Sequence, residues 1–145
     1  MDVSYPIIKR RIAWLLGKLV SEQCSAPNNP KVWETLVYLL RDRGAGSDAV
    51  VRLTAATALR ECINVCLVSS IRKFLNTFVT SSQGKDFVAE TFAPFLSTTI
   101  PEFIQLMAEA DSLESKRKVD ESLNKVIERS GMFVSFHRSY ILYNF

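Results

Sequence analysis

The side chains that could bind a metal or act as nucleophiles are three cysteines and one histidine. Cys62 and Cys66 lie four residues apart and would share one face of a helix, but a metal ion held there would need further ligands. Cys24 and His137 are distant along the chain and no C-x-x-C pair occurs, so neither a zinc site nor a disulfide framework is indicated. We expect no metal, and we interpret the cysteines as buried thiols of a protein in a reducing compartment.

The sequence contains no motif of an enzyme active site. The phosphate-binding glycine patterns, the nucleophile elbow G-x-S-x-G and the zinc motif H-E-x-x-H are all missing. Two carboxylate pairs, Glu109 with Asp111 and Asp120 with Glu121, are adjacent or nearly so, and we interpret them as solvated helix faces. We therefore predict no catalytic residue, no cofactor and no enzymatic activity.

The composition is that of a folded chain with a mild positive charge. Of its 145 residues 48% are hydrophobic and 23% are charged, and the net charge is +3. No apolar run approaches the roughly 18 residues of a membrane helix, and the first residues do not read as a signal peptide. A nucleic-acid-binding domain would be expected to have a pI above about 9 with a clustered basic stripe, so we rank that class lowest.

One helical pattern occurs three times and indicates how the side chains would be arranged. Residues 8–16 align with residues 51–59 at an offset of 43, and residues 115–123 form a weaker copy at a further offset of 64. The basic residues Lys9, Arg52 and Lys116 coincide in the three copies. Units of roughly 40 to 47 residues that are built from antiparallel helix pairs are typical of HEAT and armadillo arrays. The pattern predicts an all-α fold, an α-solenoid of about 2.5 such repeats.

The apolar periodicity and the helix-ending residues predict five helices. We expect the first four at about residues 5–23, 31–43, 48–66 and 85–110, and the last at about 112–130. The fourth should be interrupted or kinked at Pro94 and Pro101 and so form two shorter pieces, because proline inside a helix costs about 3 kcal/mol or more. The two outer helices should present apolar faces that require neighbours.

Two segments depart from the repeat pattern. The second offset, 64, is longer than the first, 43, and residues 67–84 account for most of the difference. Residues 132–145 form an aromatic tail outside the repeat register. One hypothesis is that both are translated non-coding sequence in a partial gene model. The alternative is a genuine helical insertion, since Val68, Ile71, Phe74, Leu75 and Phe78 follow helical spacing.

Several segments carry a resemblance to a known family. Residues 5–17, 48–59, 92–96 and 126–129 resemble the importin-beta (karyopherin) family, most closely its importin-11-like branch. The first block is quite specific, whereas the second matches the general HEAT consensus. Members of this family are long HEAT solenoids, and the resemblance covers two to three of their central repeats.

The resemblance implies a nuclear transport receptor segment that shuttles between nucleus and cytoplasm and associates with the nuclear pore. The full-length receptor would bind protein cargo and the small GTPase Ran, with nucleoporins as further partners, and would bind no nucleic acid. In this family the second helix of each repeat lines the concave face, where partners are held. The residues expected there form a basic stripe around one aromatic side chain, namely Arg10, Arg11, Trp14, Lys18, Lys118 and Lys125.

Three alternatives stay open. Trp14 could pack against a preceding repeat, with the basic residues merely solvated. The chain could belong to another HEAT scaffold for protein–protein interaction, or it could be a non-functional partial gene product.

Overall fold

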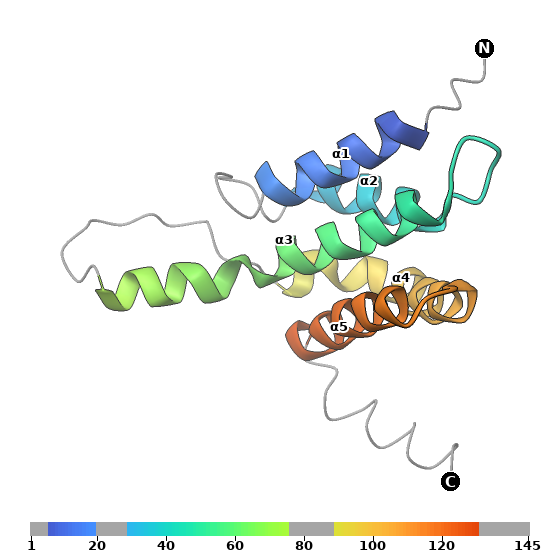
Figure 1. Cartoon of the computed structure of the whole chain (residues 1–145). Helices are drawn as coiled ribbons and strands as arrows, with labels where there is room; N and C mark the ends of the chain where they lie inside the picture. Colours follow the sequence, from blue (N-terminus) through green and yellow to red (C-terminus); the bar gives the residue numbers. More distant parts are fainter. Residues whose placement is uncertain (1–5, 20–28, 76–88, 131–145) are drawn as a thin grey trace, which may run out of the picture.

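A computed structural model describes residues 6–19, 29–75 and 89–130, and the described part folds into five helices without a strand (Figure 1). The helices are α1 (Pro6–Lys18), α2 (Pro30–Arg41), α3 (Ala49–Leu75), α4 (Ala89–Glu109) and α5 (Leu113–Arg129). None of these helices combines the length and the apolar character that crossing a membrane requires. The expected all-α solenoid is confirmed.

The helices form two layers. α1, α3 and α5 lie side by side in the first layer, and α2 and α4 lie in the second layer behind them (Figure 1). The short turns after α2 and α4 fold each of these helices back against its successor, so that α2 pairs with α3 and α4 with α5. Each pair is one structural repeat.

Local sequence signals fix where the helices begin. The Asn29 side chain accepts a hydrogen bond from the backbone N–H of Lys31 at 3.0 Å, and Pro30 occupies the first turn of α2. Asp48 accepts from the backbone N–H of Val51 at 2.8 Å at the start of α3. Ser112 accepts from the backbone N–H of Ser115 at 3.1 Å at the start of α5. These caps satisfy backbone donors that the first helical turn leaves unpaired.

The core lies between the two layers. Trp33 of α2 and Phe92 of α4 are both fully buried, and their ring centroids are 5.1 Å apart in an edge-to-face arrangement. Other large side chains that are almost completely buried come from all helices except α1: Leu36, Leu40, Leu59, Ile63, Phe103, Leu106, Val119 and Val126. The contribution of α1 to this core is small, namely Ala13 with Leu16 packed at the edge.

The predicted break in the fourth helix is wrong, because α4 is one helix that contains both Pro94 and Pro101. Each proline removes one backbone hydrogen bond, yet large side chains on both sides of the prolines are buried in the same core. Phe92 and Phe103 are fully buried and Leu106 is nearly so. Burying such a side chain contributes roughly 1.5–3 kcal/mol, so the three together can offset a cost of about 3 kcal/mol for each proline.

The third helix is longer than expected. It continues to Leu75 and therefore includes the first nine residues of the segment 67–84, which the repeat pattern treats as an insertion. The sequence offers no Gly or Pro before Gly84 to end the helix sooner. The rest of that segment and the tail at 132–145 lie outside the described residues.

Candidate functional site

The layer of α1, α3 and α5 presents the residues expected to face a partner. Arg11, Trp14 and Lys18 follow the spacing i, i+3, i+7 and therefore share one face of α1. Arg11 is exposed and the Trp14 side chain is 49% exposed. A half-exposed tryptophan beside an exposed arginine is the kind of pair that dominates protein–protein binding energy. On this face, α1 can provide an aromatic anchor.

Arg10 has a different environment. Its guanidinium donates a hydrogen bond to the carboxylate of Asp48, the residue that caps α3. This hydrogen bond is the main reason why the pKa of Asp48 lies below its usual value. Arg10 thus ties α1 to the beginning of α3, while its side chain stays 38% exposed.

The remaining cations of the expected stripe are interleaved with carboxylates. Lys18 Nζ lies 3.6 Å from Glu61 Oε1 of α3. On α5, Lys118 Nζ lies 3.5 Å from Glu114 Oε1 and Lys125 Nζ lies 2.6 Å from Glu128 Oε2. The surface carries both signs of charge in close alternation, an arrangement that suits a protein partner better than the uniformly negative backbone of a nucleic acid.

A polar groove of about 500 Å³ runs between α3 and α5 on the same layer. Arg60 Nη1 bridges it by a 2.7 Å hydrogen bond to Glu121 Oε2. The lining consists entirely of charged residues and amides, namely Arg60, Glu61, Asn64, Glu121, Asn124, Lys125 and Glu128. Of the residues expected from the sequence, only Lys125 belongs to it, so the groove as a whole was not predicted.

The repeat offsets held a signal that could have revealed the groove. Lys18, Glu61 and Lys125 occupy equivalent positions of the three sequence copies. The structure places Glu61 within ion-pair distance of Lys18 and in the same groove as Lys125. The same position of the repeat is therefore basic in α1, acidic in α3 and basic in α5. Its acidic residue, Glu61, lies between two lysines of the expected basic stripe.

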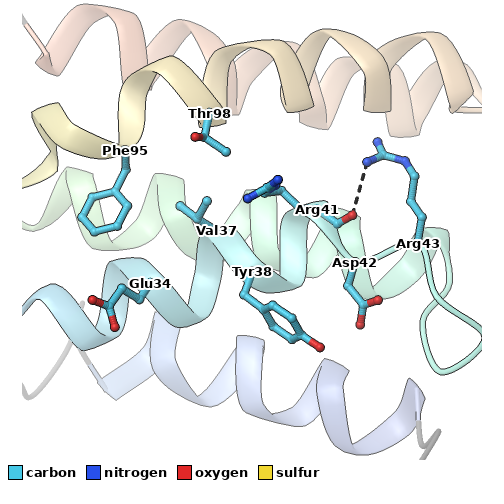
Figure 2. Close-up of a pocket in the computed structure, with 8 residues that line it drawn as sticks. All are labelled: Glu34, Val37, Tyr38, Arg41, Asp42, Arg43, Phe95 and Thr98. Carbon is cyan, nitrogen blue, oxygen red and sulfur yellow. Dashed lines mark hydrogen bonds between the residues drawn. The ribbon is translucent and has the colours of Figure 1, made fainter.

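A second groove, of about 580 Å³, lies between α2 and α4 on the opposite layer (Figure 2). Arg43 at its edge donates hydrogen bonds to Glu102 Oε2 at 2.6 Å and to Glu109 Oε1 at 3.0 Å. Asp42 accepts one from Lys9 Nζ of α1 at 2.5 Å. The other lining residues are Glu34, Val37, Tyr38, Arg41, Phe95 and Thr98. Because Arg43 and Asp42 already hold charged partners, we interpret this groove mainly as a junction between repeats.

Of the cysteines and the histidine first considered for chemistry, only Cys62 has a described side chain, and it does not belong to a reactive site. Cys62 is fully buried and its Sγ lies 3.9 Å from the backbone oxygen of Leu16, while the side chains of Cys24, Cys66 and His137 lie outside the described part. Within the described residues no group of three or more His, Cys, Asp or Glu side chains could hold a metal ion. In each carboxylate pair one member binds an arginine, since Glu109 binds Arg43 and Glu121 binds Arg60.

Comparison with known proteins gives two curated relatives with significant similarity. The chain is 27% identical to human importin-11 over 128 residues, which is 88% of this chain and 11% of that protein. It is 26% identical to mouse importin-11 over 125 residues, or 86% of this chain and 10% of that protein. No family model and no solved structure matches. The chain thus has a distant importin-like relationship, and it spans about a tenth of the length of these relatives.

Proposed function

Starting from the distant relationship to importin-11, we propose that this chain is a segment of a nuclear transport receptor and that its α1/α3/α5 layer forms part of the surface that holds protein cargo. The observation that carries the proposal is similarity along 88% of the chain to a protein of that kind. The two-layer stack of helix pairs supports it, because such stacks expose one continuous layer to a partner. Binding of Ran would be a property of the full-length receptor.

The mixed charge of this layer suggests how a cargo would be held. The pairs Lys18–Glu61 and Arg60–Glu121 join neighbouring helices and are partly exposed. Exposed ion pairs contribute only about 0–1 kcal/mol each, so a cargo with complementary charges can replace one partner at little cost. Trp14 would then supply the apolar contact at one end of the charged surface.

A receptor segment of this type would pass between nucleus and cytoplasm with its cargo. Contacts with nucleoporins would belong to the same transport cycle. All of these partners are proteins, which agrees with a surface whose cations have nearby carboxylates.

The proposal is tested by a chimeric receptor. The region of human importin-11 that aligns with this chain is replaced by the aligned residues of the chain, and import of a fluorescent cargo is measured in permeabilised cells depleted of the endogenous receptor. The expected result is import at a rate close to that of intact importin-11, with cargo release on addition of GTP-bound Ran. A control chimera carries Arg60→Glu and Lys125→Glu, which reverse two charges in the groove between α3 and α5.

Each outcome has a defined meaning. A chimera that melts at the same temperature as intact importin-11 but neither binds nor imports cargo would contradict the proposal. If the charge-reversal chimera imports as well as the first one, the α3/α5 groove has no part in cargo binding.

A further inference from the structure

The groove between α2 and α4 combines an apolar floor with an exposed arginine. Val37 of α2 is only 6% exposed, and Phe95 extends from α4 toward α2 and packs against the core, so these two side chains form the floor (Figure 2). Arg41 lines the same groove with a side chain that is 59% exposed. Tyr38, also 59% exposed, forms one wall. Tyrosine and arginine are among the residue types that contribute most to protein–protein binding energy.

The charged side chains at this edge of the stack leave one positive charge in excess. Within the described part of the chain, four cations share three carboxylates at nitrogen–oxygen distances of 3.8 Å or less, namely Lys9, Arg41, Arg43 and Arg52 with Asp42, Glu102 and Glu109. Arg41 is the most exposed of the four cations. The excess charge therefore lies at the surface of the groove, on Arg41.

Arg41 keeps most of its hydrogen-bonding capacity free. Its only carboxylate neighbour among the described residues is Glu102, whose Oε1 lies 3.8 Å from Nε, too far for a hydrogen bond. Oε2 of the same carboxylate already accepts a 2.6 Å hydrogen bond from Arg43. The Nη groups of Arg41 can therefore donate to a carboxylate from outside, and a guanidinium can bind such a group through two parallel hydrogen bonds. The hydroxyl of Thr98 lines the same groove and can donate one more.

The spacing of these groups suits an extended polypeptide. Val37 and Arg41 are four residues apart on α2, which corresponds to about 6 Å along the helix axis. In an extended chain, side chains two residues apart point to the same side and are about 6.6 Å apart. An apolar residue over Val37 and Phe95 would therefore place an acidic residue two positions away beside Arg41.

The open shape of the groove favours a protein segment over a small molecule. Small-molecule sites usually bury about 70–90% of the surface of their ligand, whereas Tyr38 and Arg41 both remain more than half exposed here. A polypeptide can place a few side chains in a groove of about 580 Å³ and continue beyond it at both ends.

We propose that the groove between α2 and α4 binds an extended segment of a partner protein in which an acidic and an apolar residue are separated by one position. The acidic side chain pairs with Arg41, and the apolar side chain packs on Val37 and Phe95. The groove lies on the layer opposite to the α1/α3/α5 surface, so this proposal does not depend on whether that surface holds cargo.

The test is an NMR titration of the isotope-labelled full chain with pentapeptides that are acetylated at the N-terminus and amidated at the C-terminus. The probe Leu-Ser-Glu-Ser-Leu offers the required spacing in either chain direction. We expect it to bind about fivefold or more tightly than Leu-Ser-Gln-Ser-Leu, which has the same shape without the charge. Ser-Ser-Glu-Ser-Ser lacks the apolar side chains, and Ser-Leu-Glu-Leu-Ser directs them to the opposite side from the glutamate, so both should bind more weakly than the probe.

Substitutions locate the binding. Arg41→Gln should abolish the preference for the glutamate peptide over the glutamine peptide, and it should leave the melting temperature almost unchanged because the side chain is largely exposed. The matched control is Arg117→Gln on α5, which removes the same charge from a side chain that is 63% exposed and does not line this groove. The preference should persist in this control.

Three results would overturn the proposal: equal binding of the glutamate and glutamine peptides, no resonance shift at about 1 mM probe, or a preference that survives Arg41→Gln. Competition with sodium acetate separates a protein segment from a free carboxylate. We expect acetate at the concentration of the probe to leave the probe bound. Displacement of the probe by this acetate would show that the groove binds a carboxylate alone, and would also contradict the proposal.

Discussion

Lys9 of α1 donates a 2.5 Å hydrogen bond to Oδ2 of Asp42, the residue that ends α2. The equivalent residue of the next sequence copy, Arg52, lies in α3 with its Nε 3.8 Å from Oε2 of Glu109, the last residue of α4. In the first two copies the basic residue therefore reaches the end of the second-layer helix of the following repeat. This contact explains why a basic side chain occupies this position in the first two copies.

These contacts predict that the protein becomes less stable in acid. Hydrogen bonds from Lys9, Arg10 and Arg43 lower the pKa values of Asp42, Asp48 and Glu109 respectively. The unfolded chain therefore binds more protons than the folded chain in acid, so the stabilisation is complete above the ordinary pKa values of 4.5 for Glu and 3.8 for Asp and is lost as the pH falls below them. Urea unfolding between pH 7 and pH 3 should show a constant midpoint to about pH 5 and then a decline.

Asp42→Asn provides the control for this acid dependence. The variant should be less stable at pH 7 and should have a flatter pH profile, because one of the shifted carboxyl groups is gone. A wild-type midpoint that stays constant down to pH 3 would contradict the assignment.

Gly17 allows α1 and α3 to approach closely. A Cβ at this position would lie 3.0 Å from the Cβ and 3.1 Å from the Cα of Ala58, which belongs to the backbone of α3 and cannot simply rotate away. We expect Gly17→Val to lower the free energy of unfolding by about 1–3 kcal/mol, as overpacking generally does. The control is Gly44→Val in the exposed turn before α3, where the nearest atom is the flexible Asp42 carboxylate at 3.2 Å. Equal losses in the two variants would argue against a close helix contact at Gly17.

Asp48 should be a more important helix cap than Ser112. Both side chains accept a hydrogen bond from a first-turn backbone N–H, but Asp48 also binds Arg10. Ser112→Ala should cost about 1 kcal/mol, and Asp48→Ala should cost up to about 1 kcal/mol more, since the ion pair is partly exposed. Asp48→Asn keeps the capping oxygen and loses only the charge, so it should cost at most about 1 kcal/mol and less than Asp48→Ala. Urea midpoints of the three variants measure this order, and a larger loss for Ser112→Ala would contradict it.

The two tryptophans should differ sharply in their effect on stability. Trp33 is fully buried against Phe92, so Trp33→Ala should cost about 3–5 kcal/mol. Trp14 is half exposed, and Trp14→Ala should cost less than about 1 kcal/mol. In the chimeric receptor, Trp14→Ala should weaken cargo binding without lowering the melting temperature. Unchanged cargo affinity together with a lower melting temperature would show that Trp14 is a packing residue.

The number and the type of the helices could be predicted from sequence, because local signals carry that information. Pro30, Gly44 and Gly46 separate the second and third helices, and Ser112 caps the fifth. Continuity of α4 through Pro94 could not be predicted in this way, since the stabilisation comes from burial of the side chains of α4 against the other helices. Local propensity gives the cost of a proline but not the tertiary contacts that offset it.

The buried face of α1 illustrates a second limit. Hydrophobic periodicity identifies an apolar stripe through Ile12 and Leu15, yet the residues that face α3 are Ala13 and Gly17. Small residues carry little weight in a hydrophobic pattern, although they allow two helices to approach closely. For the candidate site, the sequence indicated Lys18 and Lys125 but not Glu61 between them, because an ion pair between helices depends on packing rather than on local spacing.

The unequal size of the side chains in the two layers has a consequence for the shape of a longer stack. Gly17 and Ala58 separate α1 from α3, whereas the bulky rings of Trp33 and Phe92 separate α2 from α4. When helices are closer together in the first layer than in the second, each added repeat is rotated relative to the one before it. The axis of the stack therefore bends toward the first layer. The residue at position 17 is therefore one determinant of curvature, and enlarging it would straighten the stack as well as weaken it.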